Sequence, residues 1–194
     1  MEFRCYKLEW LKYIFCKYIV LSLIFPLIGS SCLLVFAGFL RVSELIYIER
    51  SDIIFESCYV SIFIPKSKTD IYRDWNTVAI SRTDNNLCPV TNLETYLLWA
   101  NISPNSDEFI FRNLIKCKDR FEFRKQNRPL SYTRMREVFI DAFKPFVSDI
   151  KKYGLHSLRS GDVTIAVNLG ISDRLFKKNG RWRSETAKNG YVKD

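Results

Sequence analysis

The longest apolar stretch of the chain runs from Tyr18 to Leu40 and contains no charged residue. A stretch of this length must be buried in a protein core or in a lipid bilayer. Pro26 and the run of small residues at 29–31 interrupt it, and the part that precedes them is too short to span a bilayer. We therefore predict a soluble protein in which this stretch lies in the core, with a membrane-anchored protein as the alternative. No signal-peptide cleavage site is recognisable.

The composition suits one domain with a proper core and a polyanionic partner. The chain has 194 residues, of which 47% are hydrophobic. Lysine and arginine number 30 against 21 acidic residues, which gives a net charge of +9 and a pI near 9.3. Such an excess favours a partner rich in phosphate, and a basic domain without a nucleic-acid role is the alternative.

The six cysteines form no C-x-x-C pair, and the chain has one histidine. These ligands are too few for a zinc finger, so no metal site is predicted. The spacing does not resemble a disulfide framework either. We therefore read the cysteines as thiols of a reducing compartment, nuclear or cytoplasmic.

The periodicity predicts a mainly helical protein with a small antiparallel sheet, an α+β fold. Residues 58–65 and 76–80 alternate as strands and should pair as a hairpin with a basic tip. Residues 114–128 are basic and resemble a loop, and 108–113 are a short strand or an extended segment. Helices are expected at 30–48, 89–102, 131–147 with Ser131 as N-cap, 155–170, 172–180 and 184–191.

Two short patterns carry arginines in unusual places. Arg41 follows an apolar run, where it needs an anion or a carboxylate, and Glu44 lies three residues further on. A simple ion pair between these two residues is the alternative. His156 and Arg159 lie one helical turn apart and can reach one pocket, although a lone histidine is more often structural.

A tyrosine close to the end of the chain, Tyr191, is either an ordinary packed aromatic residue or a nucleophile. Attack of a phenol on a phosphodiester adds negative charge to the non-bridging oxygens, and fixed arginines would stabilise that charge. The leaving oxygen then needs a proton, which a lysine can supply. Lys66 and Lys68 at the hairpin tip are candidates, and a solvated turn is the alternative.

Taken together, the segments GFLRVSEL, SKTDIYR, HSLRSG and GRWRSETAKNGY resemble, in order and register, the catalytic domain of the tyrosine recombinases, the phage integrase family. Residues 31–194 carry this resemblance, which is closest to integrase-like proteins of eukaryotic mobile elements. Residues 1–30 form an unmatched apolar stub. Family members usually have a separate helical clamp domain before the catalytic domain, and we expect it to be missing here.

The resemblance implies the central chemistry of the site. Tyr191 would attack the scissile phosphate and form a 3′-phosphotyrosyl link. Arg41 and Arg159 would hold the phosphate oxygens, and Glu44 would support the first arginine. No metal and no cofactor is implied.

It also implies the proton transfers. Lys68 would protonate the leaving 5′-oxygen, with Lys66 as the fallback, and His156 would assist at the tyrosine. Trp182, nine residues before the tyrosine, would pack against the site. Asp162 departs from expectation, because a carboxylate there would oppose a bound anion.

The implied function is a site-specific DNA recombinase or integrase that acts on paired sites of double-stranded DNA as a homo-tetramer. The alternative is a degraded or domesticated relative that binds DNA without cutting it.

Overall fold

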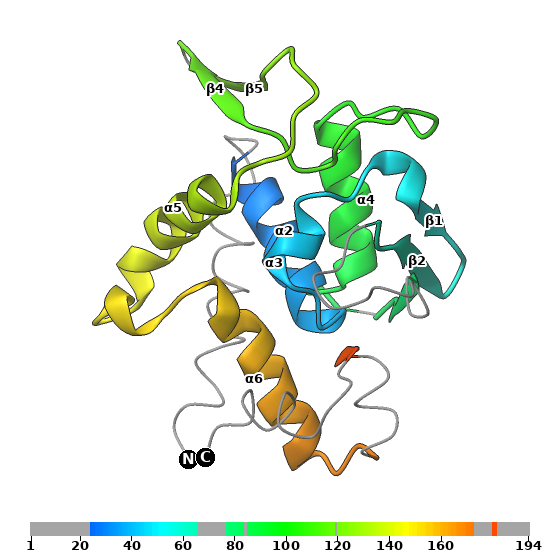
Figure 1. Cartoon of the computed structure of the whole chain (residues 1–194), viewed down its shortest axis with the longest axis vertical. Coiled ribbons are helices and arrows are strands. Elements are labelled where there is room, and N and C mark those ends of the chain that lie inside the picture. The colour runs from blue at the N-terminus through cyan, green and yellow to red at the C-terminus, as the bar shows by residue number, and fades with distance from the viewer. Residues whose placement is uncertain (1–23, 66–76, 84, 119, 173–179, 182–194) are drawn as a thin grey trace.

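The computed structural model has an α+β layout in which a small three-stranded sheet lies to one side of the helices (Figure 1). The fold class predicted from the sequence is confirmed. The structure describes residues 24–65, 77–83, 85–118, 120–172 and 180–181.

Helix α2 (Ile24–Ala37) is the centre of the core. It packs against helices α4 (Pro89–Trp99), α5 (Tyr132–Phe143) and α6 (Leu155–Asn168). Residues 27–35 of this helix are all buried, and Leu34 is 0% exposed. The described part of the apolar stretch is therefore core. No helix within the described ranges combines the length and apolar character that crossing a bilayer requires.

The single helix predicted over 30–48 is wrong in both its start and its continuity. Helix α2 already includes residues 24–29, and its serines do not start it, because Ser31 Oγ donates to the Ile28 carbonyl (2.8 Å). The chain then turns at Gly38 and Phe39, and Phe39 has φ +49°. A Cβ on Gly38 would lie 2.9 Å from the Leu34 carbonyl oxygen and 2.9 Å from Ile80 Cδ1, and because the backbone oxygen cannot move aside, only glycine fits. A short second helix, α3 (Val42–Leu45), follows.

The three-stranded antiparallel sheet has the order β1 (Ile53–Phe55), β2 (Tyr59–Phe63), β3 (Thr77–Ser81). The two predicted strands are confirmed, and β1 is additional. Alternate residues of β2 and β3 point into the core, which is the period-two pattern of a half-buried sheet. The tip between β2 and β3, with Lys66 and Lys68, lies outside the described residues.

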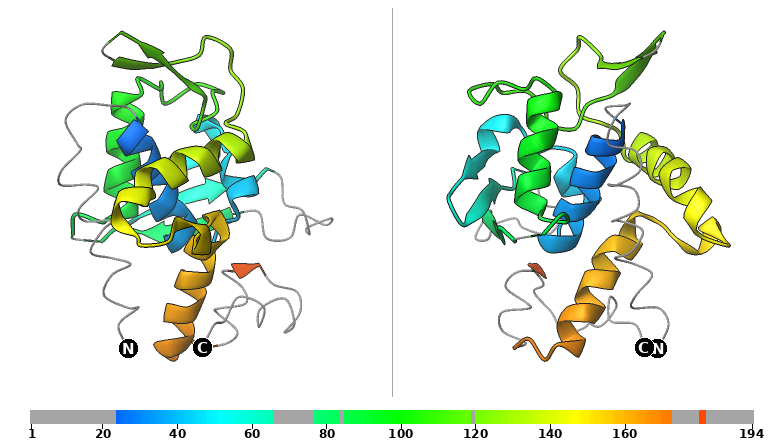
Figure 2. Two further views of the ribbon diagram at one scale, coloured as in Figure 1. Left: turned by 90° about the vertical axis from the view of Figure 1, so that its left-hand side faces the viewer. Right: turned by 180° about the vertical axis from the view of Figure 1, so that it is seen from behind.

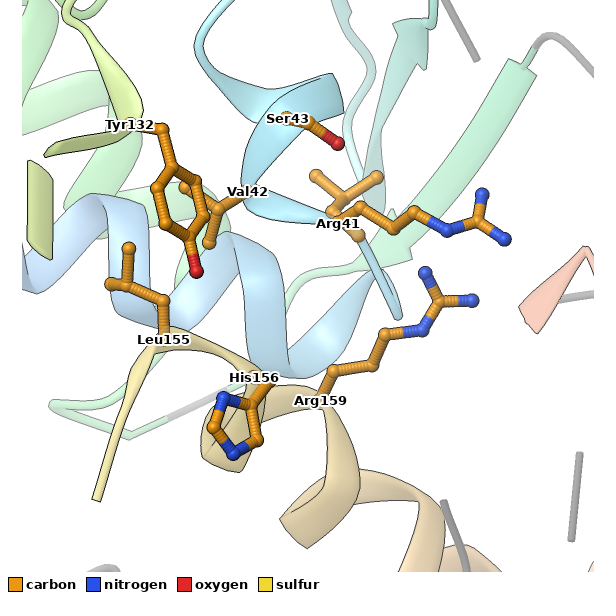
Figure 3. Close-up of a pocket in the computed structure, with 8 residues that line it drawn as sticks. Arg41, Val42, Ser43, Tyr132, Leu155, His156 and Arg159 are labelled. Atoms are coloured by element: carbon orange, nitrogen blue, oxygen red, sulfur yellow. The ribbon is translucent and has the colours of Figure 1, made fainter. Parts of the chain in front are cut away.

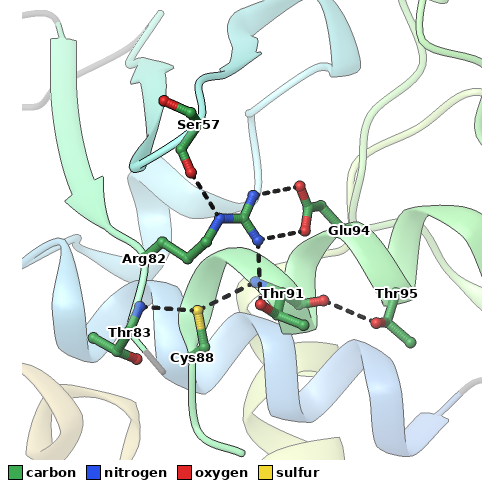
Figure 4. Close-up of polar contacts among 7 residues, drawn as sticks. All are labelled: Ser57, Arg82, Thr83, Cys88, Thr91, Glu94 and Thr95. Atoms are coloured by element: carbon green, nitrogen blue, oxygen red, sulfur yellow. Dashed lines mark hydrogen bonds and ion pairs between the residues drawn. The ribbon is translucent and has the colours of Figure 1, made fainter. Parts of the chain in front are cut away.

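One arginine ties this sheet to helix α4 (Figure 4). Arg82, just after β3, makes two hydrogen bonds to the Glu94 carboxylate (2.7 and 2.8 Å), and its Nε donates to the Ser57 carbonyl. The start of α4 is capped by Cys88, whose Sγ accepts from the backbone N–H of Thr91 and Thr83. The predicted start of this helix at Pro89 is confirmed.

The basic segment 114–128 contains a hairpin rather than only a loop. Strands β4 (Leu114–Cys117) and β5 (Arg120–Phe123) pair antiparallel and project from the helical body in each view (Figures 1 and 2). The register places Lys116 opposite Phe121 and Leu114 opposite Phe123. This alternation was present in the sequence, but the dominant basic charge obscured it.

The two last described helices match their predictions. Ser131 Oγ accepts from Arg134 N at the start of α5, which buries Met135, Phe139 and Phe143 along one face. Helix α6 ends before Gly170, whose φ of +69° is the left-handed conformation expected after a helix. The helix predicted at 184–191 and all but the two end residues of the helix predicted at 172–180 lie outside the described residues.

Candidate active site

A pocket opens where the turn after α2, helix α3 and the N-terminal ends of α5 and α6 meet (Figure 3). Its volume is about 150 Å³, which suits a phosphate-sized group and a few waters better than a large organic ligand. Eight residues line it: Leu40, Arg41, Val42, Ser43, Tyr132, Leu155, His156 and Arg159.

The first arginine is held by a carboxylate from the adjacent helical turn. Glu44 is the third residue of α3, so it folds back onto the residue before the helix. Its carboxylate accepts from Arg41 N (2.8 Å) and from Arg41 Nη1 (2.7 Å). The Arg41 side chain keeps 20% exposure and lines the pocket, whereas the Glu44 side chain is 1% exposed. The buried carboxylate of Glu44 thus orients Arg41, whose side chain lines the pocket.

A second arginine shares this carboxylate. Arg181 Nη2 donates to Glu44 Oε2 (2.6 Å) and to the Phe39 carbonyl (3.3 Å). Burial would raise the pKa of Glu44, but the charge of Arg181, the backbone N–H of Arg41 and the charge of Arg41 outweigh it and hold that pKa below its ordinary value. Glu44 therefore stays ionised between two guanidinium groups.

The third arginine, Arg159, comes from the second turn of α6. Its side chain is 2% exposed, and its Nη2 donates to the Gly180 carbonyl. Figure 3 shows its guanidinium pointing toward that of Arg41. Two buried or half-buried cations that face one another favour an anion between them.

His156 and Tyr132 complete the pocket on its other side. His156 is exposed in the first turn of α6, one turn before Arg159. Tyr132 is the first residue of α5, 48% exposed, and its hydroxyl points into the pocket (Figure 3). Both can donate a hydrogen bond to a bound anion.

Asp162 lies three residues after Arg159 on α6 and is buried. Burial raises its pKa to about 8, although the charge of Arg159 acts in the opposite direction. The carboxyl group is therefore mostly protonated at neutral pH. The expected opposition to an anion, which assumed a charged carboxylate, is thereby largely removed.

Of the predicted site residues, the structure brings together Arg41, Glu44, His156 and Arg159. The remaining predicted site residues, Lys66, Lys68, Trp182 and Tyr191, lie outside the described residues. Sequence reasoning missed Arg181 and Tyr132. Neither gave a signal, because Arg181 is one of several basic residues near the end of the chain and Tyr132 follows an ordinary helix cap.

Comparisons of sequence find no relatives: no family model matches the chain, and no curated protein does. Comparisons of structure do. The XerH site-specific recombinase bound to palindromic difH substrate superposes with a TM-score of 0.71 at 15% identity, over 96% of this chain and 47% of that chain. The Tn1549 transposon integrase in complex with circular intermediate DNA gives 0.59 at 13% identity, over 97% and 59% of the two chains.

XerA recombinase gives a TM-score of 0.60 at 14% identity, over 89% of this chain and 58% of that chain. The chain thus spans about half of the first of these recombinases and just under three fifths of the other two. It has the fold of the tyrosine recombinase catalytic domain. At these identities the likeness establishes the fold, and the chemistry has to be argued from the pocket.

Proposed function

We propose that this chain is the catalytic domain of a site-specific DNA recombinase or integrase that breaks and rejoins strands through a 3′-phosphotyrosyl intermediate. One observation carries the proposal: in this fold, Arg41 and Arg159 converge on a phosphate-sized pocket, and Glu44 and the Gly180 carbonyl orient them. Guanidinium groups bind phosphate oxygens by paired hydrogen bonds and remain protonated throughout the reaction.

The proposed step is a displacement at phosphorus. The phenolic oxygen of Tyr191 forms a bond to the scissile phosphorus, and the bond from phosphorus to the 5′-oxygen breaks. His156 assists removal of the phenolic proton, and Lys68, or Lys66 in its place, donates a proton to the 5′-oxygen. Arg41 and Arg159 bind the two non-bridging oxygens, where negative charge grows in the transition state. Trp182 packs against the site.

The DNA partner is supported by a second region, which we call the basic hairpin: β4, β5 and the segment to residue 128. Five of its basic side chains are exposed to solvent, where a phosphate backbone can reach them. The segment leads directly into Ser131 and Tyr132 at the pocket. The exposed basic side chains of the basic hairpin are Lys116, Lys118, Arg124, Lys125 and Arg128.

The assembly and setting follow from the same proposal. Recombination of two paired duplex sites requires cleavage of four strands, which a homo-tetramer supplies with one nucleophile for each strand. A DNA substrate and thiols that are unpaired at Cys32, Cys58, Cys88 and Cys117 favour a nuclear or cytoplasmic location. In this proposal, residues 31–194 form the catalytic domain. The recombinase would serve the integration of a mobile element.

Covalent trapping tests the proposal. Purified protein is mixed with labelled, nicked duplex DNA and separated on a denaturing gel beside a Tyr191→Phe variant. A slower band that depends on Tyr191 is the expected result. A folded protein that binds the duplex but gives no such band would instead be a relative that binds DNA without cutting it.

A further inference from the structure

Residues 180 and 181 contact both arginines of the pocket. The Gly180 carbonyl accepts from Arg159 Nη2, and the Arg181 side chain forms an ion pair with Glu44, which in turn holds Arg41. These contacts join α6, α3 and a segment more than 130 residues further along the chain than Glu44. Arg181 also lies ten residues before Tyr191 and immediately before Trp182.

The charge balance around Glu44 explains why a second cation is needed. The Glu44 side chain is 1% exposed, and a buried carboxylate needs a nearby cation to compensate for its lost hydration. With Arg41 as its single partner, the pair would be neutral overall, and little positive charge would remain for a ligand. With Arg181 also bound, the cluster carries one net positive charge, and Arg159 adds another. Arg181 therefore shares the neutralisation of Glu44 with Arg41, so that these arginines together present a net positive charge to an anion.

The backbone conformation of Arg181 is unfavourable for a residue with a side chain, which indicates that the arginine side chain has a role there. Arg181 has φ +53°, a left-handed conformation that glycine adopts most readily and that costs a branched or long side chain free energy. An arginine here is nevertheless 7% exposed and makes two hydrogen bonds. The buried ion pair offsets the unfavourable conformation.

We propose that Arg181 is a positioning residue for the phosphate pocket: it neutralises Glu44, so that Arg41 presents its charge to the scissile phosphate. This inference rests on the proposed function.

The decisive experiment is a double-mutant cycle between Arg181→Met and Glu44→Gln. Methionine keeps most of the side-chain length without the charge, and glutamine keeps an acceptor for Arg41 without the negative charge. We expect Arg181→Met to slow formation of the Tyr191–DNA adduct by about 10- to 100-fold, with DNA affinity changed less than about twofold. In the Glu44→Gln background the same change should slow it less than about threefold.

Recovery in the double variant separates this role from a merely structural one. A residue that only stabilises the fold would remain damaging whether or not Glu44 is charged, and equal losses in both backgrounds would overturn the proposal. Arg181→Lys keeps the charge and should recover most of the rate. If Arg181→Met alone does not fold, as judged by circular dichroism, the comparison within the Glu44→Gln background still decides, because no uncompensated carboxylate is buried there.

A second readout keeps this inference distinct from the proposed function. Binding of inorganic phosphate to the pocket, followed by calorimetry, does not require strand cleavage. We expect Arg181→Met to weaken it about tenfold or more and the double variant to recover it. Wild-type protein that forms the adduct while Arg181→Met changes neither readout would overturn this inference alone. Wild-type protein that binds phosphate in an Arg181-dependent way but forms no adduct would overturn the proposed function alone.

Discussion

The basic residues of the candidate active site, which we call the arginine pocket (Arg41, Arg159 and Arg181), are buried or half-buried, whereas those of the basic hairpin are exposed. In the pocket, Arg159 and Arg181 are 2% and 7% exposed, and each is hydrogen-bonded to a named acceptor. In the basic hairpin, the side chains of Lys116, Lys118, Arg124, Lys125 and Arg128 are exposed to solvent. The comparison shows that positive charge by itself does not define a site.

The difference follows from solvation. A buried guanidinium loses its water and has to be compensated by protein groups, which also fix its direction. An exposed lysine keeps its water and its freedom, and its field is screened within about 8 Å at physiological salt. Buried cations suit an exact transition-state geometry, and exposed cations suit sequence-independent affinity for a phosphate backbone.

The largest expected effect separates the two regions by chemistry. Arg159→Lys keeps the charge but loses the planar fork and the bond to the Gly180 carbonyl, so adduct formation should fall about 1000-fold. DNA affinity, measured by fluorescence anisotropy, should change less than about threefold. The matched control is Arg124→Lys in the basic hairpin, which should leave both quantities unchanged. Equal losses in the two variants would remove the distinction between the regions.

Neutralising the basic hairpin should have the converse effect. Replacing Lys116, Arg124, Lys125 and Arg128 by glutamine should lower affinity for duplex DNA about 100-fold at low salt. The slope of log affinity against log salt should become shallower by about 3 to 4, because each contact with a phosphate contributes about 0.9. At saturating DNA, adduct formation should keep its wild-type rate.

Exchange of lysine for arginine, and the reverse, at the same four positions is the control for the hairpin. These exchanges preserve charge and should preserve affinity. An unchanged salt slope in the glutamine variant would show that the DNA passes elsewhere.

The pH dependence of the free energy of unfolding should depend on the buried Asp162 near the pocket and not on Glu122 in the basic hairpin. The pKa of Asp162 is raised to about 8 from an ordinary value of 3.8, so the folded protein holds a proton that the unfolded chain releases. Its contribution to stability is complete below pH 4 and is lost as pH rises toward 8. Asp162→Asn should therefore raise the free energy of unfolding at pH 8 by about 2 kcal/mol, with no gain near pH 3.5.

The acid of the hairpin is the control for this prediction. Glu122→Gln should change the free energy of unfolding by less than about 0.5 kcal/mol at either pH, measured by urea denaturation. A pH-independent gain from Asp162→Asn would mean that its carboxyl group is ionised in the folded protein.

The smallest effect should lie at the helix end that joins the two regions. Ser131 caps α5 by accepting from Arg134 N (3.1 Å), and Ser131→Ala should cost about 1 kcal/mol of stability. Ser106→Ala, in an exposed turn, is the matched control and should cost less. A loss of adduct formation larger than the loss of stability would show that this cap also places Tyr132 in the pocket.

Part of the site was predictable because its members are close in sequence. Glu44 lies three residues from Arg41, and His156 lies three residues from Arg159, so helical geometry alone places each pair on one side of the chain. The proximity of one pair to the other required the packing of α2 against α6, which no local pattern encodes.

The errors in the predicted secondary structure also arise where local sequence patterns are insufficient. At the break between α2 and α3, the space for a Cβ on Gly38 is limited by the nearby Leu34 carbonyl and also by Ile80, which is distant in sequence. The hairpin at β4 and β5 was obscured by its charge, although the alternation of Leu114, Phe121 and Phe123 was present. Local periodicity predicts an element where neighbours in the chain decide it, and fails where a distant residue does.

The sequence by itself determined the fold class, most helix and strand positions, the paired arginine patterns and the likeness to a tyrosine recombinase. Tertiary structure alone decided that Arg181 reaches Glu44, that the Gly180 carbonyl meets Arg159, and that Tyr132 lines the same pocket. The physical reason is that hydrogen bonds and ion pairs in a buried site depend on distances between side chains. Those distances are set by how elements far apart in the sequence pack together.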